Sequence, residues 1–241
     1  MVQLLRTFDQ QHRRQTLTQV CRRSGIPLAT CHRMLREMTR LGLVAQQQNG
    51  QFTIGHLVWE LGMLSPVQRG LRQVASPFMQ DLLAATRQIV NLFVLDTDRA
   101  LLVERMSGSA VGEPFAVPGD RLPLHTSAAG KVFLAHGALG EDPLSVLALT
   151  KETAHSIASS SLLREELGLI GRRGWATTAE EQVDGAWGLA VPVFGLGGEV
   201  VAALGIVTVA PLEDPSRVVP ALKVTSAAIS RAMVGREMRE N

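Results

Sequence analysis

Residues 16–43 read TLTQVCRRSGIPLATCHRMLREMTRLGL, and this stretch predicts two short helices joined by a tight turn. We expect Thr18 to cap the first helix, because its hydroxyl can accept a hydrogen bond from a free amide of the first turn. Gly25 ends that helix, since glycine readily adopts the left-handed backbone. A second helix is predicted over residues 28–41, with core positions at helical spacing: Met34, Leu35, Met38 and Leu41. This arrangement is typical of a helix-turn-helix, whose second helix enters the major groove of DNA.

The residues that follow are typical of a winged helix. Residues 43–45 and 51–54 alternate like strands, and Asn49-Gly50 between them favours a hairpin. An alternative is a small helical bundle capped by a hairpin, with cations that serve only solubility. Residues 1–62 carry eight arginines and three acidic residues, a net of +5, so the rest of the chain carries −3 of the total of +2. This asymmetry favours DNA binding.

The second helix of this motif would supply most of the DNA contacts. The residues expected nearest the base edges are Leu28, Ala29, Thr30, His32 and Arg33. Arg33 can donate two hydrogen bonds to one guanine, which discriminates between bases. Phosphate contacts set affinity and register without reading sequence. The remaining candidates for DNA contact are Thr18 and, for phosphates, Arg22, Arg23, Arg36 and Arg40, with wing residues 48–51.

Composition bounds the class of protein. The chain has 241 residues, of which 46% are hydrophobic and 19% charged, as in ordinary globular proteins with one small and one medium domain. No run approaches the roughly 18 apolar residues of a membrane span, and the N-terminus lacks the pattern of a signal peptide. Cys21 and Cys31 have no matching pair of histidines or cysteines, so no zinc site is expected. We therefore expect a cytoplasmic protein with reduced thiols, no metal, no cofactor and no membrane contact.

The domain organisation follows from the hydrophobic patterns. We predict a DNA-binding domain over residues 1–55, linker and dimerisation helices over 56–86, and a second domain over 87–241. Mixed helices and hairpins in the second domain, without regular βαβ alternation, indicate an α+β domain with an antiparallel sheet. Its expected strands are 89–95, 100–106, a short one at 115–117, 189–194 and 199–209, before a final helix over 215–237.

Several patterns resemble catalytic motifs without meeting their requirements. Gly130-Lys131 is not a phosphate-binding loop, because His125 stands where that loop needs a glycine and Val132 where it needs a hydroxyl. Ser127 and Lys131 are one position too far apart for a Ser-x-x-Lys pair. The acidic pairs 165–166 and 180–181 are expected to be solvated. No catalytic residue and no enzyme activity are predicted.

A ligand pocket is better supported. Residues 126–130 are small and supply amide donors near a helix start, which favours an anionic or polar ligand group. Trp175 and Trp187 could supply apolar walls. The alternative is that these small residues only let a helix pack closely on the sheet.

Taken in order, these segments resemble the IclR family of bacterial transcriptional regulators across nearly the whole chain. The resemblance rests on GIPLATCHRMLREMTRLGLV, FTIGHLVWELG, LPLHTSAAGKVFLA and RRGWATTAEEQVDGAWGLAVPVFGLGGEVVAALGIV. It implies a winged helix, a linker helix and a GAF-like effector domain. It also implies a homodimer or homotetramer that binds double-stranded promoter DNA under control of a small-molecule effector, often one with a carboxylate.

The sequence departs from this family where the effector would bind. Gly188 stands where relatives commonly have cysteine, Gly205 and Val207 where they have serine, and Thr178 or Ala179 where an acid is expected. Since sites match the polarity of their ligands, these changes favour an effector larger and more apolar than glyoxylate, such as an aromatic acid. The expected ligand-binding residues are Thr126, Ser127, Ala128, Ala129, Thr178, Trp187, Gly188, Gly205 and Val207.

The resulting hypothesis is a sequence-specific DNA-binding regulator controlled by a small organic or aromatic acid. The rival hypothesis is a metabolite-sensing module whose winged helix docks a protein partner. The basic residues 1–62, which contain no lysine, argue against the rival.

Overall fold

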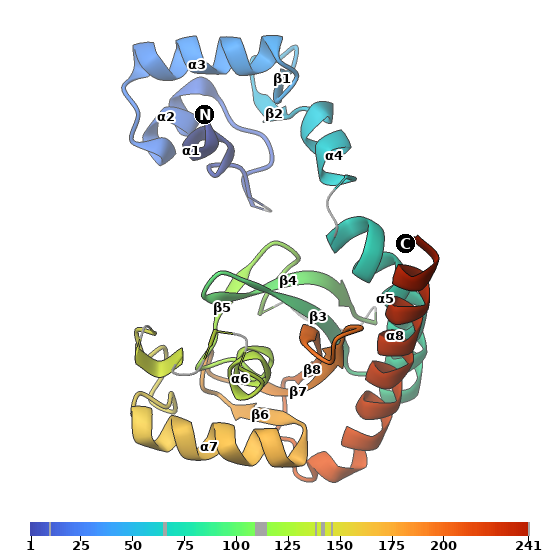
Figure 1. The fold of residues 1–241 in the computed structure, drawn as a ribbon. Helices are drawn as coiled ribbons and strands as arrows, with labels where there is room; N and C mark the ends of the chain where they lie inside the picture. Colours follow the sequence, from blue (N-terminus) through green and yellow to red (C-terminus); the bar gives the residue numbers. More distant parts are fainter. Residues whose placement is uncertain are drawn as a thin grey trace. The chain divides into compact units, whose positions relative to one another are not determined.

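The fold was analysed in a computed structural model, which describes residues 1–9, 11–64, 67–108, 115–137, 139–140, 143–145 and 147–240. The chain divides into two compact units, residues 1–69 and 70–241 (Figure 1). This division falls inside the segment 56–86 that the sequence assigns to linker and dimerisation helices. Among the described residues, no helix is both long and apolar enough to cross a membrane.

The first unit is a winged helix-turn-helix, as predicted. In chain order it contains α1 (Val2–Leu5), α2 (Leu17–Ser24), α3 (Leu28–Arg40), β1 (Val44–Gln46), β2 (Phe52–Ile54) and α4 (His56–Gly62). β1 and β2 pair antiparallel and form the wing. One apolar core joins these elements: Leu4, Val20, Cys21, Cys31, Leu35, Met38, Val44 and Phe52.

Two expectations for the helix-turn-helix are wrong by a short distance along the chain. Thr16, not Thr18, caps α2: its Oγ1 accepts from the Gln19 amide at 3.3 Å, and Gln19 Oε1 accepts from the Thr16 amide at 2.8 Å. This reciprocal capping box satisfies two amides, so it outcompetes a cap two residues later. Helix α3 ends at Arg40, and Leu41 is 39% exposed rather than buried. Cys31 takes the fourth core position.

The second unit is an α+β domain built on one antiparallel sheet. Its strands are β3 (Ile89–Asp96), β4 (Arg99–Met106), β5 (Arg121–Pro123), β6 (Ala176–Ala179), β7 (Trp187–Phe194) and β8 (Val200–Thr208), in the order β5-β4-β3-β8-β7-β6. Its α-helices are α5 (Gln73–Thr86), which follows a π-helical turn at Val67–Arg72, then α6 (Ala128–Ala135), α7 (Ser160–Arg173) and α8 (Val219–Glu240). Short 3-10 turns occupy Pro143–Ser145 and Pro215–Arg217.

The predicted strand at residues 115–117 is wrong. The edge strand is β5, which pairs with residues 99–101 of β4. Residues 117–120 form a turn instead, because Asp120 Oδ2 accepts from the Val117 amide at 2.8 Å and Gly119 adopts a φ of +103°.

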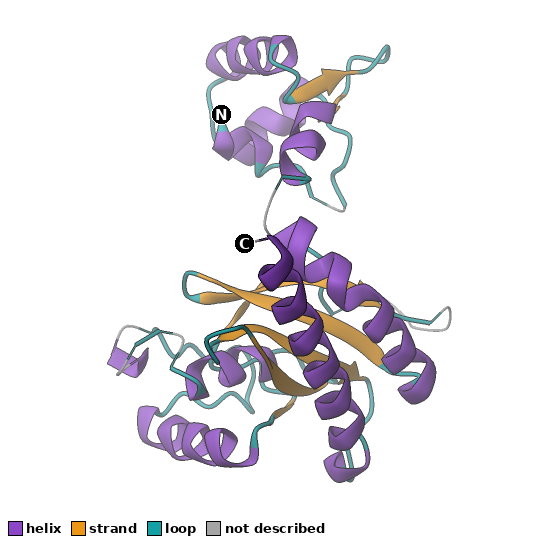
Figure 2. Ribbon diagram, turned by 45° about the vertical axis from the view of Figure 1, so that its right-hand side comes forward, coloured by secondary structure: helices purple, strands orange, loops and turns teal. Residues whose placement is uncertain are grey.

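Helices cover both faces of the sheet. α5 and α8 lie side by side on one face (Figure 2), where they pack on Val90, Leu92, Leu204 and Ile206. α6 covers the other face, and α7 packs on α6. Burial on both faces explains why the sequence of β3 reads IVNLFVL, an apolar run interrupted by one asparagine.

Candidate nucleic-acid interface and ligand cavity

The exposed side of α3 carries a basic stripe. Cys31, Leu35 and Met38 are buried in the core of the winged helix. At 100° per residue, the side chains that point directly away from this core are those of Ala29, Arg33, Arg36 and Arg40, and all four are exposed. Leu28, Thr30 and His32 are exposed as well and flank the stripe.

The arginines of this stripe differ in their partners. Arg40 donates to Glu37 from Nη2 at 2.5 Å and from Nε at 3.0 Å, which lowers the pKa of the Glu37 carboxyl. Arg33 and Arg36 make no side-chain hydrogen bond or ion pair with any residue that the structure describes. Their guanidinium groups are therefore available to an anionic partner.

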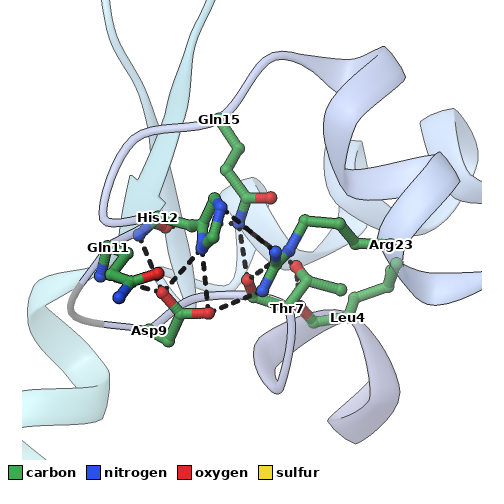
Figure 3. A network of polar contacts seen from close by, with 7 residues as sticks. All are labelled: Leu4, Thr7, Asp9, Gln11, His12, Gln15 and Arg23. Atoms are coloured by element: carbon green, nitrogen blue, oxygen red, sulfur yellow. Dashed lines mark hydrogen bonds and ion pairs between the residues drawn. The ribbon is translucent and has the colours of Figure 1, made fainter.

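Arg23, in contrast, belongs to a polar network inside the first unit (Figure 3). Its Nη2 lies 2.6 Å from Asp9 Oδ2, its Nε donates to the Thr7 carbonyl at 3.1 Å, and Nη1 lies 3.2 Å from His12 Nε2. The Gln15 amide also donates to the Thr7 carbonyl, at 2.8 Å. These contacts hold the loop between α1 and α2 against α2. Arg23 therefore stabilises the first unit, in addition to any contact that it makes with phosphate. Arg22 and Thr18 are exposed on α2.

The second unit contains a cavity between the start of α6 and the sheet. Its volume is about 60 Å³, which is more than one buried water needs. The structure brings together in its lining all nine residues predicted to contact a ligand: Thr126, Ser127, Ala128, Ala129, Thr178, Trp187, Gly188, Gly205 and Val207. Trp175 is elsewhere, with the Arg173 guanidinium 3.9 Å from its ring centre.

Strand register explains why residues so far apart in sequence line one cavity. Arg105 on β4 pairs with Asn91 on β3, and Asn91 pairs with Gly205 on β8. Two residues further along β8, Val207 pairs with Gly188 on β7, which pairs with Thr178 on β6. Paired residues of an antiparallel sheet share a face, so these positions lie under α6.

Glycines create part of the hollow. A Cβ atom at Gly188 would lie 2.7 Å from Thr178 Oγ1 and 3.4 Å from the Ala128 Cβ. A Cβ atom at Gly205 would lie 2.9 Å from the Leu189 carbonyl oxygen. The absence of side chains at these two positions leaves the floor of the cavity open.

One of the three first-turn amides of α6 is already used within the protein. Ser127 caps the helix: its Oγ accepts from the Gly130 amide at 3.2 Å and donates to the Pro123 carbonyl at 2.6 Å. A Cβ atom at Gly130 would lie 2.3 Å from the Leu124 Cα. For Gly130, close packing on the preceding chain accounts for the glycine.

Sequence reasoning missed three polar residues of the cavity, Asn91, Arg105 and Gln182. Asn91 is 2% exposed, and its Oδ1 has no hydrogen-bond partner among the described residues. Thr126, which was predicted, is fully buried, and its Oγ1 likewise has no partner among them. Arg105 also lines the cavity, and burial lowers the pKa of its guanidinium. The single asparagine in an apolar strand is a signal that could have identified Asn91. Nothing local marks Arg105, because its position depends on strand pairing.

The prediction that the acidic pairs are solvated is wrong for one member of each pair, Glu166 and Glu181, whereas Glu165 is exposed. Lys131 is fully buried, and its Nζ lies 2.7 Å from both carboxylate oxygens of Glu181 and 2.9 Å from Glu166 Oε2. Glu181 is only 7% exposed, and burial raises its pKa. This ion cluster, Lys131 with Glu166 and Glu181, connects α6 and α7 to the segment before β7. That segment contributes Gln182 and Ala186 to the cavity wall.

Neither site contains the ligand set of a metal. In the described part of the chain, no three histidine, cysteine or acidic side chains gather closely enough to hold an ion. Cys21 and Cys31 are buried free thiols in the core of the winged helix. Burial and the neighbouring Cys21 raise the pKa of Cys31 to about 12, so its thiol stays protonated.

Comparison with known proteins agrees with both units. Residues 1–48 match the IclR helix-turn-helix domain, and residues 65–231 match the C-terminal domain of the bacterial transcriptional regulator IclR. The chain is 28% identical to the transcriptional regulator XynR of Escherichia coli, over 96% of this chain and 94% of that protein. It is 30% identical to the transcriptional repressor IclR of E. coli, over 79% of this chain and 71% of the repressor.

A solved structure shows the same fold with a ligand. The crystal structure of an IclR homolog from Microbacterium hydrocarbonoxydans, complexed with 4-hydroxybenzoate, superposes with a TM-score of 0.87 at 30% identity and covers 96% of each chain. The sequence motifs, the winged helix, the α+β domain and these matches agree. The chain therefore belongs to the IclR family of bacterial transcriptional regulators.

Proposed function

We propose that this regulator binds specific promoter DNA through α3 and that a small organic acid, aromatic in character, controls the binding. The observation that carries the proposal is the pair of partner-free guanidinium groups of Arg33 and Arg36 on the exposed side of a helix-turn-helix recognition helix. Cations presented in this way are the usual means of contacting bases and phosphates.

The partners of each arginine divide the expected roles. Arg33 lies in the first half of α3, the part that reaches base edges, and supplies sequence discrimination. Arg36 and Arg22 contact phosphates. Arg40 contacts a phosphate after its ion pair with Glu37 breaks. Leu28, Ala29, Thr30, His32 and Thr18 complete the contact surface. A homodimer or homotetramer with two-fold symmetry would require a near-palindromic operator.

The cavity supports an acid with an apolar body. Phe93, Leu122 and Trp187 contribute apolar lining, while Asn91 and Thr126 contribute polar atoms without protein partners. Such a site binds a ligand that is apolar over most of its surface and polar at one end. The homolog complexed with 4-hydroxybenzoate agrees with this class. Ligand binding would act on DNA affinity through α4, the linker helix.

The test measures binding of the full chain to its own upstream DNA and to random DNA of equal length, over a salt series. We expect tighter binding to the upstream fragment that persists at physiological salt, and an altered affinity when the effector is added. Equal and weak binding to both fragments that disappears as salt rises would contradict the proposal. A protein partner for the winged helix would then become the better explanation.

A further inference from the structure

One end of the cavity carries a cation and two polar groups without protein partners. The guanidinium of Arg105 makes no hydrogen bond or ion pair with any described residue, although it is partly buried. Asn91, its pairing partner on β3, holds a buried Oδ1 that accepts from no described residue, and Thr126, at the start of α6, holds a buried hydroxyl that bonds to none. Buried polar groups in folded proteins are nearly always satisfied. Two such buried oxygens beside a partly buried cation, all lining one cavity, indicate a polar ligand group at this place.

The buried lysine near the cavity and one amide of the first turn of α6 are already engaged. Lys131 is held by Glu181 and Glu166. The Gly130 amide at the start of α6 donates to Ser127. Among the described residues that line the cavity, Arg105 is the one cation. An anionic ligand group therefore finds a full positive charge on β4, and the amides of Ala128 and Ala129, which donate to no described residue, lie at the helix start of the same cavity.

We propose that Arg105 binds the carboxylate of the effector, with the Thr126 hydroxyl and Nδ2 of Asn91 as neutral donors, and that the apolar body of the effector lies over Gly188 and Gly205. This inference rests on the proposed function and deepens it, because it assigns the recognition of the acid to named residues. A guanidinium matches a carboxylate with two parallel hydrogen bonds. The register places Asn91 between Arg105 and Gly205, so the ligand runs across β3 toward β8.

The experiment compares acids with amides of the same shape. Benzoate and 4-hydroxybenzoate are titrated against benzamide and 4-hydroxybenzamide, using the full chain and calorimetry. Removal of the carboxylate charge should weaken binding about 10- to 100-fold in the unsubstituted protein, because hydrogen bonds to charged groups are the stronger kind. Arg105→Gln should bind acid and amide alike. A preference for the acid that survives in Arg105→Gln, or no preference in the unsubstituted protein, would overturn the proposal.

Two further variants separate recognition from folding. Arg99→Gln makes the same change on the same strand, at an exposed residue that pairs with Asp98 outside the cavity; it should keep the full preference for the acid. Arg105→Lys keeps the charge without the planar fork, so it should retain a reduced preference. Loss of the preference in Arg99→Gln, or its absence in a folded Arg105→Lys, would count against a charge-based role of Arg105.

The outcome is independent of DNA binding. The salt series on upstream and random DNA uses no ligand, so it tests the regulator hypothesis alone. An acid preference that depends on Arg105 in a protein without specific DNA binding would support this inference and contradict the proposed function. Specific DNA binding with no preference for the acid would support the DNA-binding part of the proposed function and contradict this inference.

Discussion

Replacing the buried Lys131 tests the ion cluster that supports the cavity wall. Lys131→Met keeps most of the side-chain volume and removes the charge, which leaves Glu181 buried and without its cation. Removing one partner of a buried ion pair destabilises proteins by about 3–5 kcal/mol. Glu166 is less buried than Glu181 and can turn toward water, so we expect the lower half of that range. A loss of about 3 kcal/mol is a large fraction of the roughly 5–15 kcal/mol that stabilises a domain.

The assay is urea unfolding, with the exposed Lys151→Met as the matched control. Lys151→Met should change the free energy of unfolding by less than about 0.5 kcal/mol. The double variant Lys131→Met with Glu181→Gln should recover much of the loss, since replacing a buried pair is far less damaging than breaking it. Urea unfolding resolves differences of about 1 kcal/mol in the free energy of unfolding. If Lys131→Met changes that free energy by less than about 1 kcal/mol, this reasoning is refuted.

The same variant has a pH signature. Burial raises the pKa of Glu181 in the folded protein, and Lys131 opposes this shift. A carboxyl whose folded pKa exceeds its unfolded pKa binds more protons when folded, so stability falls as pH rises between the two values. Without Lys131 the pKa of Glu181 in the folded protein rises further, so the pH range over which stability falls extends to higher pH. The destabilisation by Lys131→Met should therefore be smaller at pH 5 than at pH 8, and an equal loss at both would contradict the assignment.

Three other predictions follow from the contacts. Arg33→Ala should reduce the preference for operator over random DNA, whereas Arg36→Ala should weaken both equally and lower the slope of log affinity against log salt by about one; fluorescence anisotropy measures both. Gly188→Cys should weaken binding of 4-hydroxybenzoate relative to smaller acids in calorimetry, because a Cβ there would lie 2.7 Å from a hydroxyl oxygen of β6. Thr16→Ala should destabilise the winged helix by about 1 kcal/mol in urea, and Thr18→Ala by less than half of that.

Each of these predictions has a result that would contradict it. Equal losses on operator and random DNA in both arginine variants would refute the division between base and phosphate contacts. An unchanged order of ligand affinities in Gly188→Cys would place the ligand outside the cavity. Equal destabilisation by the two threonine variants would contradict the capping box.

The sequence alone determined the architecture of the first unit and the class of the second. Apolar residues at helical spacing, Gly25 with its φ of +67° and the Asn49-Gly50 turn are local signals, and each acts within a few residues of itself. The local pattern led to five of the nine predicted cavity residues, 126–129 and Trp187, and the resemblance to the IclR family added Thr178, Gly188, Gly205 and Val207. Local signals were too coarse to choose between Thr16 and Thr18, because both can start a helix and only the reciprocal bond with Gln19 separates them.

The tertiary structure alone decided which charged groups meet. Lys131 and Glu181 are 50 residues apart, and their contact arises because α6 packs against β6 and β7. Arg105 reaches the cavity because β4 pairs with β3 in a register that sets it opposite Asn91. A shift of one residue in that register would turn Arg105 to the other face of the sheet. β3 and β4 form a hairpin across Thr97-Asp98, and this short turn fixes the pairing from Asp96–Arg99 to Phe93–Leu102. The irregularity between Leu92 and Phe93 then shifts the register by one residue, so that Arg105 rather than Glu104 lies opposite Asn91. No signal along the chain marks the place of that shift.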